Sequence, residues 1–276
     1  MDRLWPLRVL TASIVKEWLI RRRYPLLLWS WFLWPILFVL GLVFTARALA
    51  GPGGEAGAFA RNAGTADYTG FMGMGVATWM TLNWMLWTLG TSLRREQQLG
   101  TLEVLWMTPV PRVFLMLGRG VADMLQAILL FVFALLEFHL LFGLSIKGSF
   151  ITLAIVMAAS LPSLYGLGLA FASLVLWVKE ANAAVFFVRG IFTLFAGLTY
   201  PLAVLPDWMR AVASWLPLTY TVEGVRQVGL NGASLAALGP ILLPLLGFGA
   251  FFVLAGQAAF TWTERRVKRL GTLGAF

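Results

Sequence analysis

Long apolar runs alternate with short polar segments along this chain of 276 residues. Six of the runs are roughly 18–30 residues long, which at about 1.5 Å per helical residue approaches or exceeds the thickness of a bilayer's hydrocarbon core. Pro35 and Pro162 fall inside two of the runs and predict kinks there. The predicted spans cover residues 25–46, 68–93, 113–142, 150–177, 183–200 and 238–262.

The first 24 residues have helical periodicity but too many charges to span. One helical face carries Leu7, Leu10, Ile14 and Trp18. The charged residues Arg8, Lys16 and Glu17 lie off that face. This pattern predicts a helix lying in the membrane interface over residues 1–24. The alternative is a polar leader that only anchors orientation; a signal peptide is excluded by the lack of an apolar core with a cleavage site.

A polar stretch over residues 94–111 separates the second and third runs. Leucines and a tryptophan recur in it at helical spacing, and Pro109 and Pro111 end the helix. The stretch contains no His, Cys or Asp. We therefore predict a short amphipathic helix that docks onto a partner and carries out no chemistry.

Three prolines, Pro201, Pro206 and Pro217, divide the segment before the last run. The pattern predicts a short helix capped by Asp207 and a second helix over residues 219–230 that ends at an Asn-Gly pair. Each is about 18 Å long, too short to cross a bilayer. We predict a hairpin over residues 201–232 that enters the outer leaflet and returns; the alternative is a lid lying on the surface.

Composition supports an all-α integral membrane protein rather than a soluble one. Sixty per cent of residues are hydrophobic, 12% are charged, and the mean hydropathy is +0.83. The net charge of +9 does not indicate nucleic-acid binding, because the basic residues border apolar runs. Cys is absent, His occurs once, and no phosphate-binding loop is present. If ATP drives this protein, another chain must bind it with Mg²⁺, and we expect no cofactor in this one.

The distribution of Lys and Arg predicts the orientation. Sixteen of these residues fall at the N-terminus, in the segments after the second and fourth spans and at the C-terminus, and five fall on the other side. The positive-inside rule then places both termini and residues 94–111 in the cytoplasm. We expect a multi-pass protein of the cell membrane.

Two motifs resemble one family. The pattern E-x-x-x-G-T-L-E-x-L-x-x-T-P over 96–109 resembles the coupling segment of type-2 ABC transporter permeases. The stretch YPLAVLPDWMRAVASWLPLTYTVEGVR over 200–226 resembles the segment before the last span in the same family. The resemblance implies a single permease domain over residues 1–276, with six spans, an interfacial helix, a cytoplasmic coupling helix and a re-entrant hairpin in the outer gate.

The resemblance also implies residue roles. The ATPase-coupling residues would be Glu96, Gln98, Gly100, Thr101, Leu102, Glu103, Leu105, Trp106, Thr108 and Pro109. The outer-gate residues would be Pro201, Leu205, Pro206, Leu216, Pro217, Tyr220, Glu223 and Arg226. Glu103 would make a polar contact with the ATPase, while its apolar neighbours fill a groove or seat the helix on the bundle. The spacing of Glu223 and Arg226 also allows a structural ion pair.

The implied function is ATP-driven export by alternating access. The permease would form a homodimer, or pair with a related permease, and two copies of a separate ABC ATPase would bind its coupling segments. The expected cargo is a hydrophobic or amphipathic drug-like molecule or a lipid. A lipid-linked glycan is the alternative cargo, suggested by the tryptophan-rich second span.

The pathway candidates are Trp79, Asn83, Trp84, Trp87, Glu137 and His139. The residues of the second span form an aromatic and polar stripe that lines a route or only packs between helices. Glu137 and His139 lie near the outer end of the third span, at membrane depth or at headgroup level. They are two positions apart and point in different directions, which argues against a joint catalytic dyad. We expect Arg189 to extend to the cytoplasmic headgroups rather than pair with a carboxylate in the bundle.

Two other classes of function stay open on the sequence alone. An intramembrane enzyme acting on lipid would use Glu137 or His139 and need no ATPase. A membrane anchor or sensor of the same fold would bind an ATPase but move no cargo.

Overall fold

A computed structural model describes residues 5–23, 57–92, 112–178 and 181–270, together with 26, 33, 36–37, 40–41, 43–44, 96, 100 and 107. Most of the predicted first span and most of the coupling segment fall outside the described residues. Nine α-helices and two 3₁₀ turns make up the regular structure within the described ranges. They are α1 (Trp5–Arg23), α3 (Gly57–Ala63), α4 (Tyr68–Gly90), α7 (Arg112–Phe142), α8 (Phe150–Val178), α9 (Ala181–Phe195), η1 (Leu202–Val204), α10 (Asp207–Ala213), α11 (Pro217–Asn231), η2 (Leu235–Leu238) and α12 (Gly239–Leu270).

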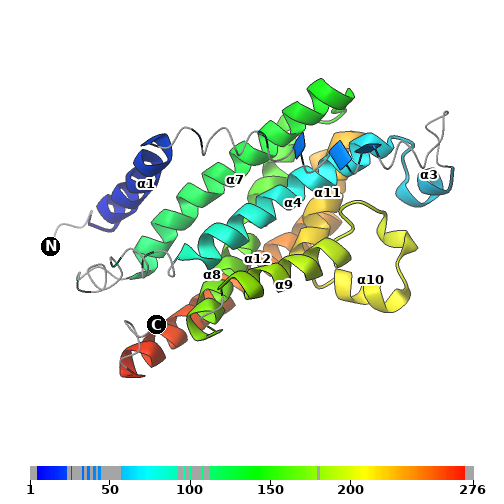
Figure 1. Ribbon diagram of the computed structural model, residues 1–276. Helices are drawn as coiled ribbons and strands as arrows, with labels where there is room; N and C mark the ends of the chain where they lie inside the picture. The colour runs from blue at the N-terminus through cyan, green and yellow to red at the C-terminus, as the bar shows by residue number, and fades with distance from the viewer. Residues whose placement is uncertain are drawn as a thin grey trace.

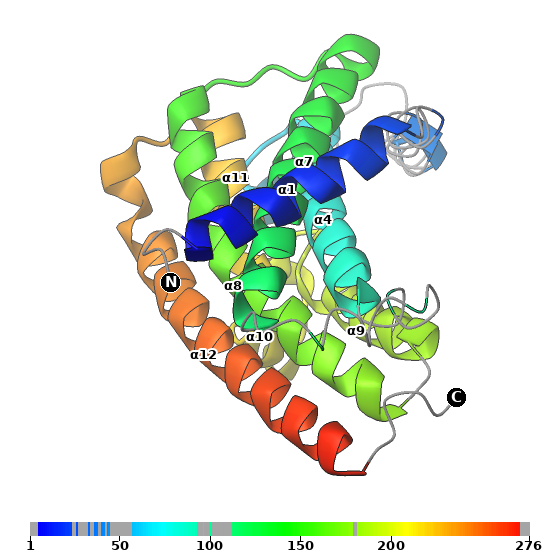
Figure 2. The same ribbon diagram turned by 90° about the vertical axis from the view of Figure 1, so that its left-hand side faces the viewer.

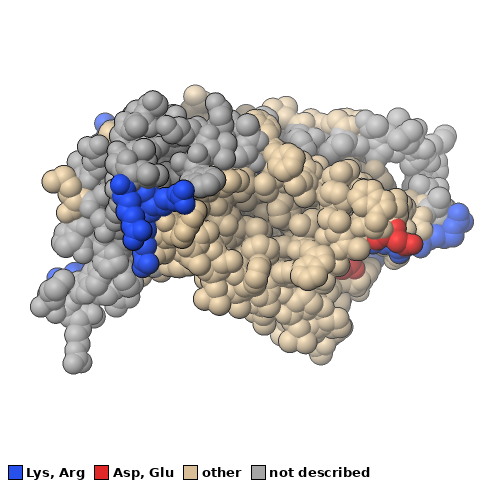
Figure 3. Space-filling model, turned by 90° about the horizontal axis from the view of Figure 1, so that it is seen from below, with Lys and Arg blue, Asp and Glu red and all other residues tan. Residues whose placement is uncertain are grey.

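Three helices in the described part are long and apolar enough to cross a membrane. The apolar stretches are Leu115–Phe142 of α7, Phe150–Leu174 of α8 and Leu235–Arg266, which covers η2 and most of α12. They correspond to the predicted third, fourth and sixth spans. Figure 3 shows one face on which the coloured Lys, Arg, Asp and Glu side chains lie only toward the two ends, with a wide uncharged band between them. Such a band is what a bilayer's hydrocarbon core requires.

Helix α4 lies at the centre of the bundle and confirms the helix predicted for the second span. Every residue from 70 to 82 is buried. Thr78 and Thr81 bond back to the carbonyls of Met74 and Ala77, so their hydroxyls need no other partner. Helices α7, α8, α9 and α11 pack around α4 (Figure 1). Neighbouring protein therefore covers this helix.

Helix α9 is shorter than the predicted fifth span, because it ends at Phe195 rather than at residue 200. Gly197 follows with a φ of 66°, a left-handed conformation that turns the chain away from the helix axis. The apolar part, Val185–Phe195, falls below the length of a spanning helix. Helix α12 is longer than predicted, since the basic residues after 262 continue the helix instead of forming a separate tail.

Helix α1 lies obliquely across α7 (Figure 2). The sequence correctly predicts the helix but not the face that packs. Gly118 of α7 approaches Leu10 and Ser13, and Glu17 is buried, whereas Trp18 is exposed. The Glu17 carboxylate, which lies off the apolar face of the helix, faces the bundle because it lies 3.8 Å from an Arg119 nitrogen of α7.

The segment before α12 folds into the two predicted short helices, α10 and α11. Asp207 is the first residue of α10 rather than its cap, and its carboxylate pairs with Arg210. Gly232 closes α11 in the left-handed conformation, as the Asn-Gly pair predicts. In Figure 1 this hairpin and α3 lie at one end of the bundle, while the C-terminal end of α12 lies at the other. Whether the hairpin enters a membrane stays a prediction.

Arg226 fastens α11 to the rest of the bundle. Its Nε donates to the carbonyl of Phe71 at 3.1 Å, and its two other nitrogens donate to the carbonyls of Gly197 and Leu198. The guanidinium lies 3.3 Å from the centre of the Phe71 ring. The expected ion pair with Glu223 is therefore not formed; that carboxylate accepts from Gln227 instead. One buried cation joins α4, α11 and the turn after α9.

A side chain at Gly75 should disrupt this junction. A Cβ added there would collide with the Leu198 carbonyl and crowd Arg226. We expect Gly75→Ala to destabilise the protein by roughly 1–3 kcal/mol, the usual cost of overpacking. The thermal midpoint of the purified protein in detergent should fall by several degrees. Gly247→Ala in α12 is the matched control, because a Cβ there meets open space; equal midpoints for the two variants would contradict the role of the junction.

Candidate functional site

Four charged side chains form an ion cluster where α1, α7 and the start of the coupling segment meet. The Glu96 carboxylate lies 3.1 Å from Lys16 Nζ and 3.4 Å from an Arg119 nitrogen. The same Arg119 nitrogen lies 3.8 Å from Glu17. Glu17, Glu96 and Arg119 are each at most 9% exposed. Their opposite signs allow these three charges to be buried together, while the Lys16 side chain stays half exposed.

The ion cluster connects three segments far apart in the sequence. Lys16 and Glu17 come from α1, Arg119 comes from the first third of α7, and Glu96 comes from the predicted coupling segment. Asp123, one turn beyond Arg119, is also buried. A displacement of the backbone at Glu96 would therefore be felt by both helices. The sequence marks each charge but does not reveal that they converge.

Other predicted coupling residues can be placed only in part. Gly100 adopts a φ of 66°, a left-handed turn conformation that favours glycine. The remaining members, Gln98, Thr101, Leu102, Glu103, Leu105, Trp106, Thr108 and Pro109, lie outside the described residues. Their contact with an ATPase stays a prediction.

An open groove of about 460 Å³ runs between α4 and α9 and ends at the turn after α9. Trp79 forms its α4 side, and the Trp79 Nε1 donates to Thr193 Oγ1 of α9 at 3.0 Å. Thr199 and Tyr200 lie at the far end. The groove has the size of a small-molecule site and the mixed aromatic and polar lining expected of one.

Arg189 lies in this groove rather than extending away from the bundle as expected. Its guanidinium carbon is 5.3 Å from the Trp79 ring centre and 5.4 Å from that of Phe186. Among the described residues, no carboxylate forms an ion pair with it, so the alternative of a carboxylate partner is not seen either. The sequence signal was present, since Arg189 occurs in an apolar helix, where a cation needs a functional or structural reason.

The other second-span candidates do not share the groove lining. Asn83 and Trp84 are half-buried, and Trp87 is exposed at 39%. Trp84 packs against the hydrophobic core. Asn83 makes no hydrogen bond within the described part of the chain, so the interhelical bond considered for it is not seen. Of the second-span candidates, Trp79 lines this groove, and a pathway role for the others stays a prediction.

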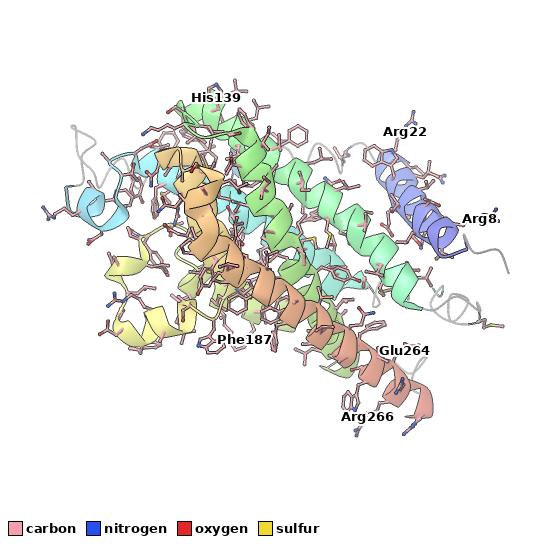
Figure 4. All side chains as sticks on the ribbon, turned by 180° about the vertical axis from the view of Figure 1, so that it is seen from behind. Arg8, Arg22, His139, Phe187, Glu264 and Arg266 are labelled. Atoms are coloured by element: carbon pink, nitrogen blue, oxygen red, sulfur yellow. The ribbon has the colours of Figure 1, made fainter. Side chains whose placement is uncertain are left out.

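Glu137 and His139 point in different directions, as their spacing predicts. Glu137 is 5% exposed, and neither carboxylate oxygen has a hydrogen-bond partner among the described residues. The His139 Nδ1 lies 2.7 Å from the Leu144 carbonyl, and its ring borders an apolar groove of about 490 Å³ between α7 and α8. Figure 4 shows His139 at the opposite end of the bundle from Glu264 and Arg266. The two groups do not form a dyad.

The predicted gate residues all belong to the hairpin and its entry turn. Tyr220 bonds through its hydroxyl to the Ser214 carbonyl, which ties α11 to the turn after α10. Its ring lies 5.7 Å from that of Phe248 in α12. Pro201, Pro217 and Arg226 are buried, Leu205, Leu216, Tyr220 and Glu223 are half-buried, and Pro206 is exposed.

Known proteins place this architecture in a family. A family model described as ABC-2 type transporter matches residues 8–230, which include the ion cluster, both grooves and nearly all of the hairpin. The chain is similar to proteins named "Probable multidrug ABC transporter permease YbhR" from Escherichia coli K12 and O157:H7. Each is 25% identical over 205 residues, which cover 73% of this chain and 54% of the relative.

The chain thus spans about half the length of the curated relatives it matches. The family match covers most of the chain, and it agrees with the coupling and hairpin motifs recognised in the sequence. This protein belongs to the ABC-2 type transporter family.

Proposed function

We propose that this chain is the permease subunit of an ATP-driven exporter, with ATP and Mg²⁺ bound by a separate cytoplasmic ABC ATPase. Two permease copies and two ATPase copies form the working unit in the cell membrane, with both permease termini in the cytoplasm. The observation that carries the proposal is the ion cluster, because it ties the start of the coupling segment to two helices of the permease. Family membership and the curated relatives named as ABC permeases support it.

The ion cluster suggests how motion would reach the bundle. Closure of the ATPase pair pushes the coupling segment, and Glu96 transmits the displacement to Lys16 on α1 and Arg119 on α7. Because α7 packs along α4, the motion continues to the centre of the bundle. The hydrogen bond from Arg226 to the Phe71 carbonyl then carries the motion from α4 to the hairpin, at the end of the bundle away from the ion cluster. The hairpin opens and closes the outer exit.

The cargo route in this proposal is the groove between α4 and α9. Its aromatic and polar lining suits an amphipathic molecule. A lipid-linked glycan is a second candidate cargo, since aromatic side chains also bind sugar faces. An enzyme acting on lipid is a further alternative, favoured only by the unpaired Glu137 carboxylate; it requires activity without an ATPase. A non-transporting anchor or sensor would bind the ATPase without moving cargo.

The coupling segment should determine ATPase association. The permease is co-expressed with the ATPase encoded beside its gene, and the two are purified together in detergent. We expect co-purification with the wild type and its loss when residues 100–103 are replaced by alanine, because the replacement removes Gly100 from its left-handed turn and removes the Glu103 carboxylate that we propose contacts the ATPase. Failure of the wild type to bind any ATPase would contradict the proposal.

Breaking the ion cluster should separate ATPase binding from transport. Glu96→Gln removes the charge shared by Lys16 and Arg119. We expect ATP-driven transport to fall about tenfold, equivalent to about 1.4 kcal/mol in the activation barrier, while the ATPase still co-purifies. Arg22→Gln is the matched control on α1, where the side chain is exposed. Full transport by a folded Glu96→Gln variant would show that the cluster does not transmit motion.

The hairpin should face the cell exterior. The chain has no cysteine, so single cysteines can be labelled without further engineering. We expect Ser234→Cys, after α11, to react with a membrane-impermeant maleimide in intact cells, because the residue is exposed. Ala12→Cys on α1, also exposed, should react only after permeabilisation. The reverse pattern would refute the assigned orientation.

A further inference from the structure

We propose that the groove between α4 and α9 binds amphipathic organic anions and that Arg189 supplies the opposing charge. This names the cargo class for the route in the proposed function, and it rests on that function for its biological role. The occupant is a molecule with one anionic group, such as a sulfonate or carboxylate, attached to an aromatic or aliphatic body.

The charge of Arg189 is available to a ligand. No hydrogen bond or ion pair joins its guanidinium to another residue in the described part of the chain, and its Nε is buried without a partner. A cation in an apolar helix is costly unless an anion or polar group meets it. Arg226 shows the alternative within the same molecule, because three carbonyls satisfy that guanidinium. No described residue supplies such acceptors to the Arg189 guanidinium.

Aromatic rings beside Arg189 suit the body of the ligand. The rings of Trp79 and Phe186 flank the guanidinium, and Phe186 is 62% exposed, so its ring has surface left for a second contact. Leu194 adds an exposed aliphatic side chain on the same helix, and both residues line the groove. An anion that pairs with Arg189 therefore places its apolar body against these side chains.

The hydroxyl groups in the groove argue against a sugar as the preferred ligand. Thr193 Oγ1 accepts from Trp79 and donates to the Arg189 carbonyl. The Tyr200 hydroxyl donates to the Leu194 carbonyl. Of the three hydroxyls in the lining, only Thr199 has no internal bond within the described residues. Sugar recognition needs several free polar groups, whereas an anion needs one free cation.

The test uses two dyes that differ in charge. The full-length protein in phosphatidylcholine nanodiscs is equilibrated by dialysis against 1-anilinonaphthalene-8-sulfonate or its neutral analogue N-phenyl-1-naphthylamine, and binding to empty nanodiscs is subtracted. We expect the wild type to prefer the sulfonate and Arg189→Gln to lower sulfonate affinity about tenfold. Neutral-dye affinity should stay within about twofold, because the apolar contacts remain. Arg189→Lys should retain most sulfonate binding.

Arg61→Gln is the matched control, since Arg61 is an exposed arginine on α3, away from the groove. Unchanged sulfonate affinity in Arg189→Gln, or an equal loss of both dyes, would overturn the proposal. If Arg189→Gln does not fold, the wild-type protein alone tests the proposal, because equal affinity of the wild type for both dyes would overturn it. Phosphatidylglycerol added to the nanodiscs separates the sources of anion, because strong competition by this lipid would assign the groove to a headgroup and reject a cargo site.

The binding measurement needs neither ATP nor an ATPase. Selective sulfonate binding without any ATP-driven transport would leave this inference standing and refute the proposed function. ATP-driven transport without selective sulfonate binding would refute this inference and leave the proposed function standing.

Discussion

Burial of α4 by protein on nearly all sides is the constraint on which the rest of the structure depends. A helix with glycines on its surface and threonines bonded to its own backbone allows neighbours to approach closely. Helices α7, α8, α9 and α11 use that surface, and α1 and α12 pack outside them. Helix α4 itself supplies Trp79 to the groove beside α9 and accepts a hydrogen bond from Arg226 of the hairpin. A movement of α4 would therefore reach both ends of the bundle.

Three arginines, Arg119, Arg226 and the half-buried Arg189, meet different surroundings in this arrangement. The ion cluster at Glu96 and Arg119 balances opposite charges between segments, and Arg226 meets carbonyls instead. Breaking either would leave a charge or several polar groups unpaired, so both hold their segments in register. Arg189 differs because its surroundings are aromatic and open. An arginine side chain thus joins helices at Arg119 and Arg226, whereas at Arg189 we propose that it binds a ligand.

Periodicity predicted most of the described helices because it reports local structure. The helical pattern of residues 1–24, the apolar runs at 113–142 and 150–177 and the prolines at 206 and 217 all correspond to helices or their boundaries. Periodicity did not predict the side-chain partners and helix ends that depend on contacts between helices. Glu17 is buried because Arg119 lies opposite, and Arg226 bonds to carbonyls rather than to Glu223, its neighbour on the helix. The end of α9 depends on the left-handed turn at Gly197.

The candidate site was less predictable than the fold for the same reason. Trp79 is one of several tryptophans at helical spacing, but only contact with α9 distinguishes it from Trp84 and Trp87.

The most direct test of the proposed mechanism is whether closure of the ATPase pair moves the hairpin. A single Ala236→Cys spin label on each permease copy, beside the hairpin, permits a distance measurement across the dimer. The account predicts a shift of this distance when the ATPase is trapped with ADP and vanadate. An identical distance with and without trapped nucleotide, or the absence of any dimer distance, would contradict it.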